Sequence, residues 1–192
     1  MLHELTVRTR SYRRFHQGVP VHMETLRNLV ELARLTASGA NLQPLKYVLS
    51  CDPGTNNRIF PLLRWAAYLK DWTGPAEGEQ PAAYIVILGD KTLRKEFGVD
   101  PGIAAQTIML GATEQGLGGC IIASVDRTAL RDVLSIPDLY EILLVLALGK
   151  PSETVVLEAV GPDGDIRYYR DAEGVHHVPK RLLATLILGE FG

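Results

Sequence analysis

Cysteine is scarce in this chain, with two among 192 residues. Cys51 and Cys120 lie in different segments and form no C-x-x-C pair, which argues against a disulfide framework or a zinc site. The adjacent His176 and His177 point to opposite faces of an extended segment, so a shared metal site is not expected either. Such cysteine usage is typical of a reducing compartment, and we expect the protein in the cytosol.

Long apolar runs and an excess of one charge are also missing. The longest apolar stretch, 142–148, is far too short to span a bilayer, and residues 1–14 contain no apolar signal-peptide core. The formal net charge is -2, so no single-sign field covers the surface to hold nucleic acid. We therefore expect no membrane and no nucleic-acid partner, and any anion site must be local.

Apolar periodicity predicts one α+β domain over 1–192, with helices packed on a central sheet and no repeat or linker. Helices are predicted over 24–37, 59–69, 102–116 and 126–136, strands over 45–51, 82–90, 118–125 and 140–149, and a last helix or strand over 179–188.

The segment 102–116, GIAAQTIMLGATEQG, is apolar almost all round. This pattern is typical of a helix buried on several sides. A monomer of this length offers few partners for such a helix, so we expect it in the core or at an interface between two copies.

The glycines of GLGG, 116–119, do not form a dinucleotide-binding fingerprint. Ile121 stands where the third glycine would be needed, and a helix precedes the glycines where a strand should. Gly116 is expected as a left-handed helix cap, while Gly118 and Gly119 would let a planar ligand approach the backbone. Cys120 is expected to pack as a small apolar residue, and no G-x-S-x-G or P-loop supports hydrolytic or nucleotide triphosphate chemistry.

Two basic clusters are candidates for a phosphate site. RTRSYRRF, 8–15, gathers four arginines around Ser11, and PKR, 179–181, follows the two histidines. Guanidinium groups and a hydroxyl suit a phosphate. Taken alone, each cluster is more simply a solvated loop, and the two form a site only if the fold brings them together.

Five segments carry a resemblance to a known family: RSYRRF, ASGANLQPLKY, GIAAQTIMLGATEQGLGGCII, LVLALGKP and HHVPKR. Their order resembles that in the nitroreductase family of FMN-dependent proteins, and the likeness runs through nearly the whole chain. It implies a three-layer α+β fold with helices around a central, mostly antiparallel sheet. It also implies a homodimer with one FMN in each of two sites at the subunit interface.

The resemblance further implies an oxidoreductase in which NADH or NADPH reduces FMN and a nitro, quinone or related small molecule then accepts the electrons. Turnover would be ping-pong, and the flavin rather than a catalytic side chain would perform the chemistry. Two alternatives stay open: specialised flavin chemistry of the same family, such as reductive dehalogenation or flavin fragmentation, and a non-catalytic FMN store or sensor.

The family's flavin contacts carry over by position. The residues implied for FMN binding are Arg10, Ser11, Arg13, Ser38, Gly39, Asn41, Gln43, Gly118, Gly119, Lys180 and Arg181. In this family the segment resembling 38–43 lies against the partner subunit's flavin, and Lys180 and Arg181 resemble phosphate contacts. Arg13 corresponds either to a residue of the family's first FMN-binding motif or to a cation at the pyrimidine edge of the flavin ring.

Two further residues, Tyr68 and Trp72, are expected in the substrate pocket, with core packing an equally good interpretation. Arg14 is expected in solvent. The chain departs from many relatives at Thr9, where they carry a second basic residue, and at Leu45, where they carry Trp. The first departure leaves Arg8 without an assigned role.

Overall fold

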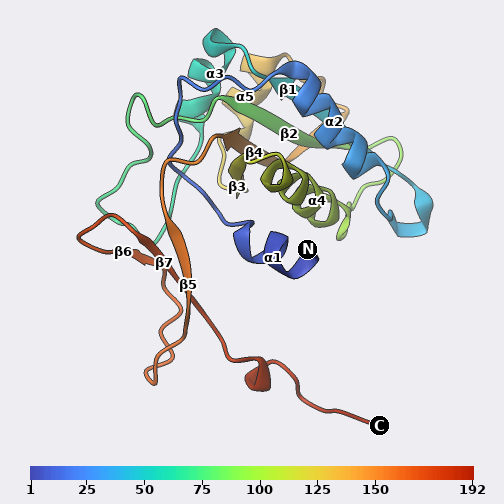
Figure 1. Cartoon of the computed structure of the whole chain (residues 1–192). Helices are drawn as coiled ribbons and strands as arrows, with labels where there is room; N and C mark the ends of the chain where they lie inside the picture. Colours follow the sequence, from blue (N-terminus) through green and yellow to red (C-terminus); the bar gives the residue numbers. More distant parts are fainter.

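A four-stranded antiparallel sheet forms the centre of the molecule in the computed structural model, which describes residues 1–192 (Figure 1). The strands are β1 (Leu45–Ser50), β2 (Ala83–Asp90), β3 (Gly118–Ile122) and β4 (Tyr140–Gly149), in the order β1-β2-β4-β3. β2 lies in the interior of the sheet and is buried along its whole length. This is why its sequence is an unbroken apolar run rather than an alternating one.

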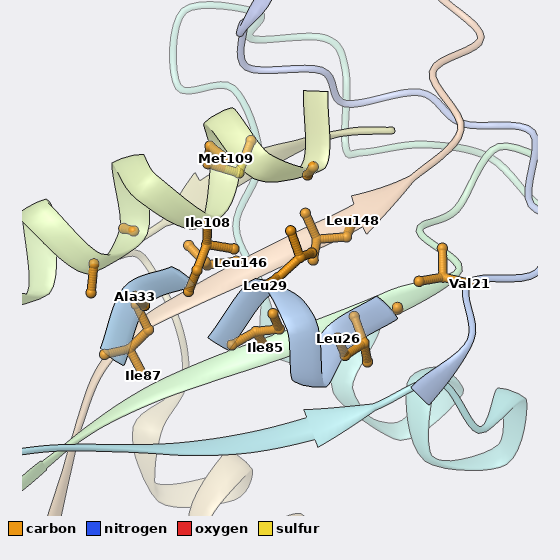
Figure 2. Close-up of a cluster of buried hydrophobic side chains, with 14 residues drawn as sticks. Val21, Leu26, Leu29, Ala33, Ile85, Ile87, Ile108, Met109, Leu146 and Leu148 are labelled. Carbon is orange, nitrogen blue, oxygen red and sulfur yellow. The ribbon is translucent and has the colours of Figure 1, made fainter. Parts of the chain in front are cut away.

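Helices cover both faces of this sheet. α2 (Met23–Arg34) and α4 (Asp100–Glu114) enclose a first core, in which Leu29 and Ile108 meet Ile85 of β2 (Figure 2). α3 (Pro53–Ile59) and α5 (Arg127–Leu134) enclose a second core with the intervening side chains of β2, such as Tyr84 and Val86. Successive side chains of β2 therefore point alternately into the two cores. The expected three-layer α+β fold is confirmed.

α4 packs closely against α2 because Gly111 has no side chain. A Cβ at this position would lie 2.5 Å from Leu32 Cδ1 and 3.1 Å from Leu29 Cδ2. α4 ends at Glu114, and Gly116 just beyond it has the expected left-handed conformation, with a φ of 74°. The N–H of Leu117 then donates to the carbonyl of Ala112 at 2.9 Å, which closes the helix end.

Several predicted boundaries are wrong. The helix predicted over 59–69 begins earlier, as α3 followed by the 3-10 turn η2 (Phe60–Leu62), because the Asp52 carboxylate accepts the N–H of Thr55 at 2.7 Å and Pro53 starts the helix. β3 ends at Ile122. Neither a helix nor a strand spans 179–188: β7 (His176–Lys180) ends within this range, and only the turn η3 (Leu183–Thr185) follows. The short helix α1 (Leu2–Arg8) was not predicted.

A second, three-stranded sheet follows β4. Together with residues 181–192, which we call the tail, it extends away from residues 1–150, which we call the body (Figure 1). It consists of β5 (Val155–Ala159), β6 (Tyr169–Arg170) and β7 (His176–Lys180), in the order β5-β7-β6, with β5 parallel to β7. We call residues 151–180 the C-terminal unit.

None of the helices of the chain is long and apolar enough to cross a membrane.

His177 connects all three strands of this unit. Its Nδ1 lies 3.1 Å from Oε2 of Glu158 on β5, its Nε2 lies 2.9 Å from Oδ2 of Asp171, and its ring stacks on Tyr169 at 4.7 Å. Hydrogen bonding to Asp171, then to Glu158, raises the pKa of His177 above 6.5. The imidazolium is therefore the form that this environment favours.

We expect His177→Gln to destabilise the protein in a pH-dependent way. Because the folded pKa is raised, the stabilisation is complete below about pH 6.5 and is lost as the pH rises through the folded value. Melting curves of the wild type and variant should therefore differ more at about pH 6 than at about pH 9. An equal difference at both pH values would show that the charge on His177 is unimportant.

Candidate functional site

Four of the predicted residues meet at one cavity of about 290 Å³, which we call the basic cavity. Arg10, Ser11 and Arg13 come from the segment after α1, and Lys180 comes from the end of β7. The remaining wall consists of Thr9, Gln106, Met109, Ile121, Tyr168, His176 and Val178. The two basic clusters, far apart in sequence, thus come together, and no acidic side chain lines the cavity.

The segment 10–13 is placed by β3. The N–H of Tyr12 donates to the carbonyl of Gly119 at 2.9 Å, and Ser11 bridges to the same glycine. A Cβ on Gly118 would lie 2.6 Å from both Tyr12 Cδ2 and Pro151 Cγ, and one on Gly119 would lie 2.3 Å from the carbonyl oxygen of Ala147. Both glycines are buried behind Ser11, so packing within the chain already requires them.

Arg13 is buried and held on several sides. Its guanidinium lies over the Tyr168 ring, 4.9 Å from the centroid, and its Nη1 lies 3.3 Å from His176 Nε2. Burial, and then the positive charge of Arg13, lowers the pKa of His176 to about 4. The imidazole is therefore neutral at neutral pH, so Nε2 accepts from Arg13 and Nδ1 carries the proton. That buried Nδ1 has no hydrogen-bond partner in the chain.

Arg10 also lines the basic cavity. Its Nη2 donates to the carbonyl of Thr6 at 2.6 Å, while its buried Nε has no partner in the chain. An unpaired buried N–H is costly, so this donor suits a bound acceptor. Together with Arg13, Lys180 and the exposed Ser11, it forms an environment that fits a phosphate or another small anion.

The other predicted group lies elsewhere, around the turn η1 (Gly39–Asn41). Ser38 Oγ donates to Asp100 Oδ2 at 2.6 Å, and the N–H of Gly39 donates to Oδ1 at 3.0 Å. Ala40, Asn41 and Gln43 have φ values of 51°, 55° and 49°, which are unfavourable for residues other than glycine. Strain of this kind gathers at functional sites.

Ser38 and Gln43 line a second cavity of about 370 Å³ between α2 and β1. None of the four predicted residues near η1 lines the basic cavity. A single chain therefore carries the two halves of the predicted site at separate places.

The aromatic pair predicted for the substrate pocket contacts the C-terminal unit. The Tyr68 ring lies 4.9 Å from that of Tyr168, and Trp72 lies under the guanidinium of Arg170 at 4.8 Å while also packing against the second core. Neither residue lines the basic cavity. Arg181 is exposed and does not line it either.

The expectation that Arg14 lies in solvent is wrong. Its Nε donates to Glu79 Oε2 at 2.8 Å, and a second guanidinium nitrogen donates to the other carboxylate oxygen. Hydrogen bonding to Glu79 raises the pKa of Arg14. The two side chains form a half-buried, bidentate ion pair, so Arg14 has a structural partner of its own.

Sequence reasoning missed Glu153, whose side chain is 1% exposed. Its carboxylate accepts the N–H groups of Arg13 and Arg14, the latter at 3.1 Å, and pairs with Arg170 at 3.0 Å. It also missed Tyr168, which lies in a polar loop without a local signal, and Gln106, the one long polar side chain within the apolar stretch 102–113. That interruption of the apolar pattern was the available sign for Gln106.

We expect Glu153→Ala to lower the free energy of unfolding by about 2–4 kcal/mol, because Arg170 and two N–H groups lose a buried acceptor. Denaturant unfolding monitored by tryptophan fluorescence measures the change. The matched control is Glu79→Ala, which removes a half-exposed partner of Arg14 and should cost at most about 1 kcal/mol. Equal losses in the two variants would contradict the role given to Glu153.

Comparisons with known proteins agree with this architecture. The sequence model of the nitroreductase family matches residues 7–150, well over half of the chain, so the chain belongs to the nitroreductase family. The Bacillus subtilis (strain 168) protein MhqN, named as an NAD(P)H nitroreductase, is 24% identical over 182 residues, covering 73% of this chain and 84% of that protein.

Solved structures of the family share the fold. A nitroreductase family protein from Streptococcus pneumoniae TIGR4 has a TM-score of 0.70 at 19% identity, covering 88% of this chain and 100% of that one. An FMN-dependent nitroreductase from Clostridium difficile R20291 has a TM-score of 0.64 at 23% identity, covering 78% and 87%. Glu153, Tyr168, His176 and Lys180 all lie beyond the residues matched by the family model.

Proposed function

We propose that the protein is an FMN-dependent oxidoreductase that uses NADH or NADPH to reduce a nitro, quinone or related small-molecule acceptor. The basic cavity carries this proposal, because three cationic side chains and a hydroxyl converge there without a carboxylate. The names of MhqN and of the Clostridium difficile enzyme support the choice of donor and cofactor. Two free cysteines in separate segments are consistent with action in the cytosol.

FMN, when bound, would supply the chemistry of hydride and electron transfer between the nicotinamide and the acceptor. In the proposed arrangement Arg10, Ser11 and Lys180 bind the phosphate. Arg13, buried and fixed by Tyr168 and Glu153, places a positive charge where it favours negative charge on the ring.

No side chain of the chain is assigned as an acid, base or nucleophile. Burial raises the pKa of the Cys120 thiol, which makes it a poor nucleophile, and His176 is neutral and already accepts from Arg13. The chain positions its substrates, excludes water and supplies charge. We propose that one site serves donor and acceptor in turn, so that turnover is ping-pong.

We expect the purified protein to bind FMN rather than FAD and to oxidise NADH or NADPH steadily when a quinone is added. Arg10→Ala should weaken FMN binding roughly ten- to a hundredfold, because a charge-assisted hydrogen bond is lost. Fluorescence titration with FMN measures the affinity, and assays with both nicotinamides measure turnover.

The matched control for Arg10→Ala is Arg58→Ala, which removes an exposed arginine on α3 and should leave FMN affinity unchanged. No affinity for FMN would exclude the proposed cofactor. FMN binding without turnover would instead favour a store or sensor.

We also propose that a second copy of the chain completes each site. The basic cavity is small for a cofactor site, and the strained residues around η1 lie outside it. β1 has an unpaired outer edge beside the second cavity, and the tail exposes Leu183, Leu188 and Phe191. A homodimer that covers these apolar surfaces would bring η1 of one copy to the basic cavity of the other, with FMN at the interface.

Deletion of residues 182–192 tests this arrangement. We expect the truncated protein to be monomeric by light scattering at micromolar concentration and to bind FMN at least about tenfold more weakly, because both halves of the site are separated. Replacing Glu190 by Gln in the full-length protein provides a control with the tail retained. A full-length monomer that binds FMN stoichiometrically would refute the proposal.

A further inference from the structure

The segment 38–43, which we call the η1 loop, has a backbone conformation that its own residues do not favour. Ala40, Asn41 and Gln43 have positive φ values, although none of them is glycine. Residues in this region keep such a conformation only where the surrounding structure holds them. The contacts that hold the η1 loop are therefore part of what makes it available for binding.

Two side chains hold the η1 loop through a chain of hydrogen bonds. The carboxylate of Asp100, a residue that is 3% exposed, accepts the hydroxyl of Ser38 at 2.6 Å and the N–H of Gly39 at 3.0 Å. The same Ser38 oxygen accepts the N–H of Gln43 at 2.9 Å. Ser38 thus closes the loop from its first residue to its last, and Asp100 fastens it to α4.

The hydroxyl of Ser38 has no proton left for a ligand. A serine hydroxyl has one proton to donate, and that of Ser38 goes to Asp100. The side-chain amide of Asn41 differs, because it is exposed and makes no hydrogen bond within the chain. The η1 loop therefore separates residues that hold its shape from a residue that is free to contact a ligand.

α4 supports both the η1 loop and the basic cavity. Asp100 lies in the first turn of this helix, and later turns carry Gln106 and Met109, which line the basic cavity. The helical rise places Asp100 about 14 Å from Met109 along the axis. α4 is buried on several sides and packs closely on α2 at Gly111. One firmly packed helix thus connects the two separate parts of the proposed flavin site.

We propose that Asp100 and Ser38 are positioning residues, which hold the η1 loop in its flavin-binding conformation without touching the flavin. This inference rests on the proposed function, in which the η1 loop of one copy meets the basic cavity of the other. A loop that is already fixed loses little conformational freedom when it binds, so its contacts contribute more to affinity. Loss of either side chain should therefore weaken FMN binding indirectly.

Amide hydrogen exchange, followed by NMR spectroscopy, tests the hydrogen bonds without any cofactor. Ser38→Ala removes the acceptor of the Gln43 N–H, whose exchange should accelerate about tenfold, while the Gly39 N–H keeps its bond to Asp100. Asp100→Ala should accelerate exchange at both Gly39 and Gln43, because Ser38 also loses the acceptor that orients its hydroxyl. Unchanged exchange at Gln43 in either variant would overturn the proposal.

Fluorescence titration with FMN tests what the η1 loop does. Ser38→Ala and Asp100→Ala should each weaken FMN binding about tenfold, because the loop must then be ordered when the flavin binds. Ser38→Thr keeps the hydroxyl, and the extended backbone at this position, with a φ of -132°, suits a β-branched residue. Its FMN affinity should stay within about twofold of the wild type.

The matched control is Asp52→Ala. The Asp52 carboxylate also accepts a backbone N–H at the start of a helix, that of Thr55 at 2.7 Å, but it lines neither the basic cavity nor the second cavity. We expect its FMN affinity to equal that of the wild type. An equal loss in Asp52→Ala, or unchanged affinity in Ser38→Ala, would overturn the positioning role.

The two measurements also separate this inference from the proposed function. A wild type that does not bind FMN would overturn the proposed function. The exchange rates at Gly39 and Gln43 would still decide whether Asp100 and Ser38 hold the η1 loop.

Discussion

The carboxylate of Glu153 is almost fully buried and accepts hydrogen bonds from two parts of the chain, one 140 residues before it and the other 17 residues after it. It receives the N–H groups of Arg13 and Arg14 from the N-terminal segment and the guanidinium of Arg170 from β6. A buried carboxylate tolerates such a position only when cations and donors surround it. The wall of the basic cavity depends on this arrangement, because it joins the segment that carries Arg10 to the unit that carries Lys180.

The central sheet and its long helices were predictable because their signals are local. β2, β4 and α4 are apolar over most of their length, so burial fixes them almost independently of their neighbours. The error at 59–69 arose from apolar residues that look helical, while the start of α3 was set by Asp52 and Pro53 just upstream. The C-terminal unit escaped prediction because its strands are short and are held by ion pairs such as His177 with Glu158 and Asp171.

The residues of the candidate site also differ in whether the sequence could reveal them. Arg10, Ser11, Arg13 and Lys180 could be named from a family resemblance, and the structure places them together. Glu153 and Tyr168 act through contacts with residues more than 90 positions away, and no spacing along the chain records such a pairing. His176 and His177 are neighbours in sequence but face opposite sides of β7. Burial lowers the pKa of His176, whereas hydrogen bonds to carboxylates raise that of His177, and the sequence alone does not reveal this difference.

The junction between the body and the C-terminal unit is short. The N–H of His16 donates to the carbonyl of Lys150 at 2.8 Å, the N–H of Ser152 donates to that of Arg14 at 3.0 Å, and Glu153 completes the contact. The extended C-terminal unit and the tail are thus attached to the body through a few hydrogen bonds, and Arg13 takes part in one of them (Figure 1). A displacement of the C-terminal unit would therefore change the surroundings of Arg13 directly, because the carboxylate of Glu153 accepts the N–H of Arg13.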